Sequence, residues 1–144
     1  MVIHLVLNAA SLFGMTVLSI EDILHKSIKK WMVFLFIISG LVISCLVRDL
    51  SEIFRSVLPG MFLLILGSIS GEKIGYGDGL TTVGLGLWAG YKSTYIAVFA
   101  GILMSFASSV IYVAVTKILK KKRQDNIPFI PFLMAGLVVS IIYG

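Results

Sequence analysis

Residues 94–115, TYIAVFAGILMSFASSVIYVAV, contain no charged side chain. An apolar run of about 20 residues is long enough to cross the hydrocarbon core of a bilayer as a helix. Residues 2–20 form a second run of this length, and residues 31–47 and 127–143 form two runs near the lower limit. These four runs predict an all-α membrane protein.

Two shorter apolar runs, residues 57–70 and 79–90, flank a glycine-rich turn. They could be short or tilted spans, or the two arms of a re-entrant hairpin. Counting them as spans gives about six transmembrane helices. The whole chain, residues 1–144, then forms a single polytopic membrane domain.

The composition agrees with this fold class. Hydrophobic residues make up 58% of the 144 residues and charged residues only 13%, and the mean hydropathy is +1.04. A soluble domain needs more polar surface than this, so we expect the lipid bilayer to be the main partner of the chain. The formal net charge of +5 would suggest nucleic acid in a soluble protein. In a membrane protein it sets orientation instead, and we expect no nucleic-acid partner.

The basic residues predict that orientation. Taking the loops alternately, one side has nine of them and the other has three, namely Arg48, Arg55 and Lys92. Basic loops face the cytoplasm. The prediction is therefore that both termini are extracytoplasmic and that Asp22 and Asp78 both lie at the cytoplasmic face. Trp88, near the end of a predicted span, is expected to be an interfacial aromatic residue.

Acidic residues beside lipid are costly and therefore candidates for function. Asp49 and Glu52 are explained by a solvated outer loop that also contains Arg48 and Arg55. Asp22, by contrast, closes the first span and Asp78 opens the fourth. An alternative is that both are ordinary interfacial charges next to lysines, and their separation in the sequence says nothing about contact.

Two carboxyl groups held close together can catalyse hydrolysis. They cannot easily both ionise, so near neutral pH they share one proton. The ionised group can take a proton from water while the other donates one to a carbonyl or a leaving amine. This chemistry needs no metal and no cofactor. The glycines before Asp78, Gly75 and Gly77, would let a substrate backbone approach closely.

Three stretches carry a resemblance to a known family. Gly75-Tyr76-Gly77-Asp78 fits a Gly-x-Gly-Asp signature, residues 85–90 (LGLWAG) resemble the Gly-x-Trp-x-Gly that follows it, and residues 127–133 (IPFIPFL) resemble an Ile-Pro-Phe-x-Pro-Phe-Leu of the last helix. In this order they resemble the type IV prepilin peptidases, which are membrane aspartyl proteases. The resemblance implies that Asp78 and Asp22 are catalytic and that Gly75, Gly77 and Lys73 shape the site.

The chain departs from that family at two places. The family has Ile-Pro-Asn a few residues after its first catalytic acid, whereas this chain has Ile28-Lys29-Lys30 after Asp22. A lysine usually found two positions after the signature aspartate is replaced by Leu80. Glu21, adjacent to Asp22, remains an alternative for the first acid.

The resemblance also implies a substrate. Larger family members carry two Cys-x-x-Cys pairs and methylate the new N-terminus, whereas this chain has one cysteine, Cys45. It resembles a form with peptidase activity only, in the cytoplasmic membrane. The implied partners are prepilin or pseudopilin-like proteins, whose short leader is removed at the cytoplasmic face. Whether these serve pili, competence or secretion is left open, as is the oligomeric state.

Two other functions remain as alternatives. Residues 74–77, IGYG, also resemble a potassium-channel filter, although Lys73 stands where a filter has a hydroxyl residue and Asp78 is predicted on the wrong side. The chain could also be a non-catalytic assembly subunit, in which Gly84, Gly86 and Gly90 only allow close helix packing.

Overall fold

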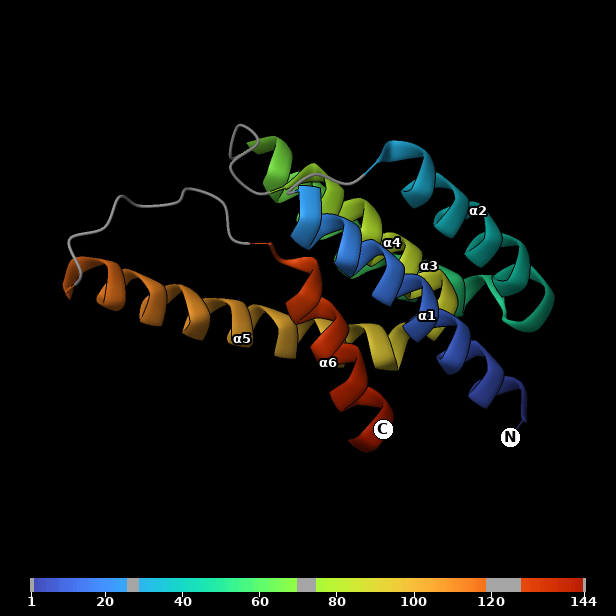
Figure 1. The fold of residues 1–144 in the computed structure, drawn as a ribbon. Coiled ribbons are helices and arrows are strands. Elements are labelled where there is room, and N and C mark those ends of the chain that lie inside the picture. Colours follow the sequence, from blue (N-terminus) through green and yellow to red (C-terminus); the bar gives the residue numbers. More distant parts are fainter. Residues whose placement is uncertain (1, 26–28, 70–74, 119–127, 144) are drawn as a thin grey trace.

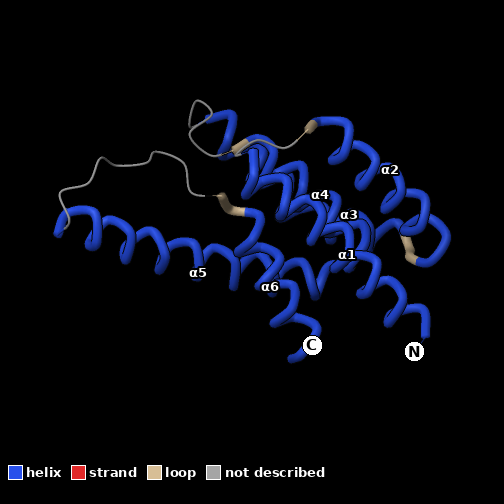
Figure 2. The backbone as a smooth tube through the Cα atoms, viewed as in Figure 1, coloured by secondary structure: helices blue, strands red, loops and turns tan. Residues whose placement is uncertain are grey.

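The computed structural model describes residues 2–25, 29–69, 75–118 and 128–143 (Figure 1). Helices make up nearly all of this part of the chain, and it contains no strand (Figure 2). In chain order they are α1 (Val2–His25), α2 (Lys30–Val47), α3 (Leu50–Ile69), α4 (Tyr76–Ala89), α5 (Tyr91–Ile118) and α6 (Ile130–Tyr143). The predicted all-α fold is confirmed, and each of the six apolar runs corresponds to one helix.

Four of these helices, α1, α2, α3 and α5, are long and apolar enough to cross a membrane. The other two, α4 and α6, have 14 residues each. At about 1.5 Å per residue, such a helix is shorter than the hydrocarbon core of about 30 Å. The short run 79–90 is therefore a short helix packed within the bundle.

The third helix is longer than its apolar run predicts. It begins at Leu50, and Glu52 lies in its first turn. A carboxylate is favourable there because the first turn of a helix carries a partial positive charge. The prediction of a solvated loop for Glu52 and Arg55 was therefore wrong, because both belong to α3.

Helix α4 lies at the centre of the bundle. It packs mainly against α3 and α2 and also contacts α1, α5 and α6. Small residues allow this packing: a Cβ atom on Gly86 would overlap the carbonyl of Ser56, and one on Gly60 would overlap the backbone of Val83. The start of α4, with Asp78, is thereby held inside the bundle.

The C-terminal end of α4 is capped by Ser44 of α2 and by Arg48, the residue that follows α2. The Arg48 guanidinium donates hydrogen bonds to the carbonyls of Leu87 and Trp88, the latter at 2.8 Å. Ser44 also donates to Leu87. Gly90 ends the helix with a φ of 83°, a conformation that disfavours any side chain. Arg48 is thus a helix cap rather than a residue of a solvated loop.

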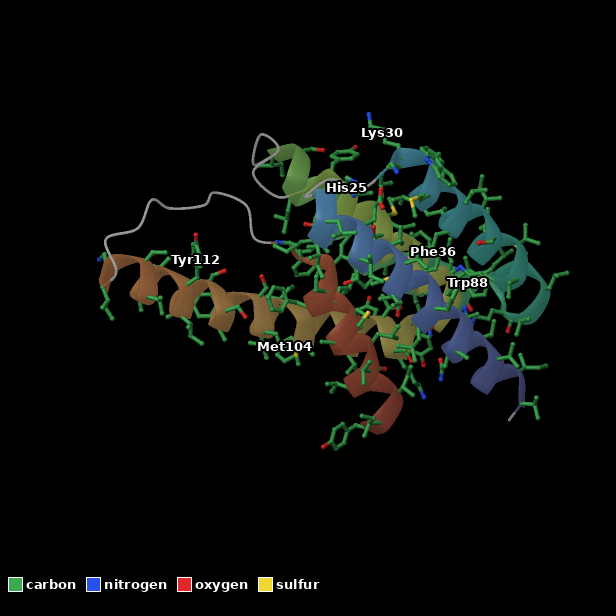
Figure 3. The ribbon with its side chains drawn as sticks, in the orientation of Figure 1. His25, Lys30, Phe36, Trp88, Met104 and Tyr112 are labelled. Carbon is green, nitrogen blue, oxygen red and sulfur yellow. The ribbon has the colours of Figure 1, made fainter. Side chains whose placement is uncertain are left out.

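Trp88 also fixes this end of α4 against α2. Its indole Nε1–H donates to the carbonyl of Phe36 at 3.0 Å, and the two rings stack with centroids 6.1 Å apart (Figure 3). Trp88 thereby joins α4 to α2, and its position at the membrane interface stays a prediction.

The ends of the first four helices are arranged as an alternating topology requires. The end of α1, the start of α2, the end of α3 and the start of α4 lie at one end of the bundle, and the marked N and C ends lie toward the other (Figure 1). Asp22 and Asp78 therefore share one end. Which side of the membrane this end faces stays a prediction from the charges.

Candidate active site

Asp22 lies in the last turns of α1 with its side chain directed into the bundle. The residue is 7% exposed. Its Oδ2 accepts a hydrogen bond from the backbone N–H of Ile130 at 3.4 Å. Ile130 is the first residue of α6, so the carboxylate lies at the N-terminal end of that helix, where negative charge is stabilised.

The IPFIPFL stretch explains this contact. The N–H groups of Phe132 and Leu133 already bond to the carbonyl of Phe129. Pro131 has no N–H to offer. The N–H of Ile130 is therefore left for a partner outside the helix, and Asp22 provides it. The stretch that resembles the family motif thus has a structural role in this fold: it places one backbone N–H donor against Asp22.

Asp78 lies in the first turn of α4, outside the four helices that are long enough to cross a membrane. Its N–H donates to the carbonyl of Gly75 at 3.0 Å. Its carboxylate turns back toward the same glycine, since a Cβ atom on Gly75 would lie 2.8 Å from Oδ2. Gly75 therefore makes room for the carboxylate of Asp78.

The two acids influence each other electrostatically. Burial raises the pKa of Asp78 to about 7, and the negative charge of Asp22 adds to this rise. Helices α1 and α4 contact each other, and both contact α6. Around neutral pH the carboxyl group of Asp78 therefore gains and loses its proton readily, as acid–base chemistry requires.

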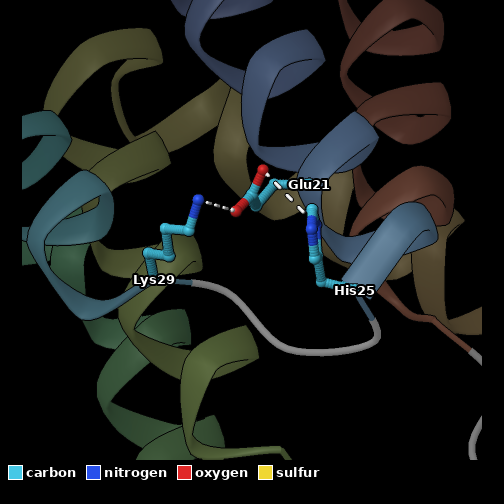
Figure 4. A network of polar contacts seen from close by, with 3 residues as sticks. All are labelled: Glu21, His25 and Lys29. Atoms are coloured by element: carbon cyan, nitrogen blue, oxygen red, sulfur yellow. Dashed lines mark ion pairs between the residues drawn. The ribbon is translucent and has the colours of Figure 1, made fainter.

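Glu21 occupies a different position from its neighbour. Its carboxylate lies 3.1 Å from Lys29 Nζ and 3.6 Å from His25 Nδ1 (Figure 4). Consecutive residues on a helix point about 100° apart, so Glu21 faces the start of α2 while Asp22 faces α6. The carboxylate of Glu21 thus faces the basic side chains of Lys29 and His25, whereas that of Asp22 is directed at a helix N-terminus.

The residues expected to shape the site are described in part. Gly75 immediately precedes α4, and Gly77 lies half-buried in its first turn, next to Asp78. Lys73 lies outside the described residues. Within the part of the chain that is described, no group of three or more His, Cys, Asp or Glu side chains could hold a metal ion.

The geometry of the turn does not suit an ion filter. Tyr76, Gly77 and Asp78 form the first turn of a helix, and the carbonyl of Asp78 accepts a hydrogen bond from Thr82 at 2.7 Å. Filter carbonyls must instead point together into a pore. Residues 74–77 therefore resemble a potassium filter in sequence only, because Tyr76 and Gly77 are helical.

Comparison with known proteins agrees with the sequence motifs. The model of the type IV leader peptidase family matches residues 9–116. The match includes Asp22 and the Gly-Tyr-Gly-Asp turn but ends before α6. No curated protein and no solved structure matches the chain. Because the family match covers most of the sequence, the chain belongs to the type IV leader peptidase family.

Proposed function

We propose that this membrane protein is an aspartic endopeptidase that removes the short leader of prepilin-like or pseudopilin-like proteins. The catalytic residues are Asp22 and Asp78, and the reaction takes place at the cytoplasmic face of the cytoplasmic membrane. Membership of a leader peptidase family supports a protease. The observation that carries the aspartic mechanism is the position of a buried Asp22 and of Asp78 at the same end of the bundle, on two helices that contact each other.

The surroundings of the two acids suggest separate roles. Asp22 lies against the N-terminus of α6, where the N–H of Ile130 stabilises negative charge. Asp78, whose pKa is raised to about 7, still holds a proton near neutral pH. Asp22 is therefore the base and Asp78 the acid in this proposal.

The reaction follows from these roles. Asp22 takes a proton from water as the water oxygen attacks the scissile carbonyl carbon, and Asp78 gives its proton to the carbonyl oxygen. The tetrahedral intermediate then collapses, the C–N bond breaks, and a proton passes from the Asp22 carboxyl to the leaving amine. The hydroxyl proton of the intermediate returns to Asp78, so the pair regains its starting state.

The position of the pair suits a substrate that is itself a membrane helix. Both acids lie at an end of the bundle rather than at its middle (Figure 1). A leader that precedes a hydrophobic helix would have its cleavage site at that depth. Nine of the twelve basic residues belong to the loops predicted on the same side as the two acids. This excess supports a cytoplasmic location of the site.

The test is a cleavage assay in cells. The protein is co-expressed with a prepilin-like substrate that has a short basic leader before its hydrophobic helix, and leader removal is followed by gel mobility. Asp22→Asn and Asp78→Asn should each abolish processing at normal membrane levels, whereas Glu21→Gln should retain it. Full processing by either aspartate variant would refute the mechanism. No processing by the unaltered protein of any such substrate would favour the assembly-subunit alternative.

A further inference from the structure

The chain has five threonines, and all of them lie in described helices. Thr81 differs from the other four. A threonine inside a helix commonly donates its hydroxyl proton to the carbonyl four residues earlier. Four of the five do so, at 2.7–2.9 Å: Thr16, Thr82, Thr94 and Thr116. Thr81 Oγ1 is buried and has no hydrogen-bond partner among the described residues.

This hydroxyl is shielded from bulk solvent, since Thr81 is 0% exposed. A buried polar group without a partner is unfavourable, and its presence in a fold calls for an explanation such as a bound water or a catalytic role. Packing alone would be served equally well by valine, which has the same shape. The packing of the described residues therefore does not explain why a hydroxyl is present here.

The position of Thr81 points to the two acids. It lies one turn after Asp78, at the i+3 position on the same face of α4. Leu85, one further turn along, packs in a buried cluster with Leu18 of α1 and Ile130 of α6. Leu18 is one turn from Asp22, and Ile130 bonds to Asp22. Along α4, Thr81 thus lies between Asp78 and Leu85, a residue of the apolar core.

The side-chain directions separate the Asp78 carboxylate from the Thr81 hydroxyl. The Asp78 carboxylate turns back toward Gly75, whereas Thr81 is about 4.5 Å further along the helix axis. The two side chains form no direct hydrogen bond with each other. A buried water needs two to four polar partners, and Asp22, Asp78 and Thr81 together supply three.

We propose that Thr81 is a positioning residue whose hydroxyl holds the water that Asp22 and Asp78 activate. This inference rests on the proposed function. The hydroxyl has one donor and two acceptor sites, so it fixes the water without changing the charge of the pair. The water oxygen is then aimed at the scissile carbonyl while its proton is directed at Asp22.

The test uses variants that separate the hydroxyl from the packing. Thr81→Val keeps the shape and removes the hydroxyl. Its kcat for leader cleavage should fall about 10- to 100-fold with KM unchanged, because a misplaced water slows the chemistry and not substrate binding. Its melting temperature should stay the same or rise, because an unpartnered polar group has been removed. Thr81→Ser should retain most of the activity.

A second pair of variants separates the loss of the hydroxyl from a folding defect. Thr81→Ser and Thr81→Ala both lack the γ-methyl group, so the ratio of their kcat values isolates the hydroxyl. Ser140→Ala is the matched control, since the buried Ser140 hydroxyl also lacks a partner among the described residues but lies ten residues along α6 from Ile130. It should leave kcat unchanged.

Three outcomes would overturn the inference: a Thr81→Val kcat within about twofold of the unaltered protein, equal kcat values for the Ser and Ala variants, or a joint fall of kcat and melting temperature. Asp78→Asn, measured in parallel, separates the two proposals. If it is inactive while Thr81→Val is fully active, only the role of Thr81 fails. If Asp78→Asn is itself active, the proposed function fails.

Discussion

The two ends of α4 are built in opposite ways. At its C-terminal end, carbonyls are satisfied by Arg48 and Ser44, and the Trp88 indole bonds to α2. At its N-terminal end, Asp78 is half-buried beside a second acid. One end stabilises the position of the helix, and the other bears unfavourable charge and burial. Strained or destabilising residues cluster at functional sites. The contrast therefore indicates that the N-terminal end of α4 belongs to the functional site.

The largest effect is expected from Asp78→Asn. Leader cleavage should fall at least about 1,000-fold, because an amide can neither donate nor regain the proton. The variant should also be more stable than the unaltered protein at pH 8, by about 2 kcal/mol. The measurements are the cleavage rate and the melting temperature in detergent at several pH values.

The pH dependence of that gain has a definite sign. The pKa of Asp78 is raised from 3.8 to about 7 on folding, so between these values the folded chain holds a proton that the unfolded chain has lost. Stability of the unaltered protein therefore decreases as the pH rises from about 4 to about 7. The gain from Asp78→Asn should be full above pH 7 and small near pH 4. A gain independent of pH would contradict the burial of this carboxyl.

Arg48→Met tests the opposite end of the helix. Removing the guanidinium leaves the carbonyls of Leu87 and Trp88 with fewer donors, which should destabilise the fold by about 2–3 kcal/mol. The pH profile of cleavage should not move, because the carboxyl pair is untouched. Arg55→Met is the control: it removes the same charge from an exposed position on α3 and should change stability by less than about 0.5 kcal/mol. Equal losses in both variants would show that charge, and not capping, is responsible.

Gly75→Ala should act on the position of the carboxylate. The added Cβ would lie 2.8 Å from Asp78 Oδ2, so the carboxylate must turn away. We expect a loss of cleavage of about tenfold, with a melting temperature close to that of the unaltered protein. Gly101→Ala crowds the backbone of Leu133 at 3.1 Å instead and should lower the melting temperature without moving the carboxylate. The same ratio of activity to stability loss in both would argue against a positioning role for Gly75.

The smallest effect is expected from Glu21→Gln. It removes the negative charge that faces Lys29 and His25. These two side chains are mostly exposed, although that of Glu21 is only 14% exposed, and we expect a loss of stability of about 1 kcal/mol. Cleavage should stay within about twofold of the unaltered protein. A loss as deep as that of Asp22→Asn would mean that the first acid is Glu21.

Charge and hydropathy alone predicted the helices and the shared end of the two acids. Both signals are local or additive along the chain, so they can be read without knowledge of contacts. The same signals gave the wrong start for α3, because Glu52 and Arg55 are charged although helical. They also assigned Arg48 to a solvated loop and did not predict the hydrogen bond of Trp88, since a cap and a cross-helix hydrogen bond depend on which helices meet.

The roles of adjacent residues lay beyond the sequence for the same reason. Glu21 and Asp22 differ by one helical step, and only the placement of α2 and α6 separates the ion-paired acid from the buried one. Thr81 and Thr82 are likewise adjacent and identical in type. The hydroxyl of Thr82 bonds to its own helix and that of Thr81 does not.

The central claim, that Asp22 and Asp78 form one electrostatic unit, can be measured directly. Carbon-13 NMR of labelled aspartate carboxyl groups, in the unaltered protein and in Asp22→Asn, gives the pKa of Asp78 with and without its neighbour. The account predicts a value near 7 in the unaltered protein and a lower value in Asp22→Asn, because a nearby negative charge has been removed. An Asp78 pKa that is ordinary in the unaltered protein, or the same in both proteins, would contradict it.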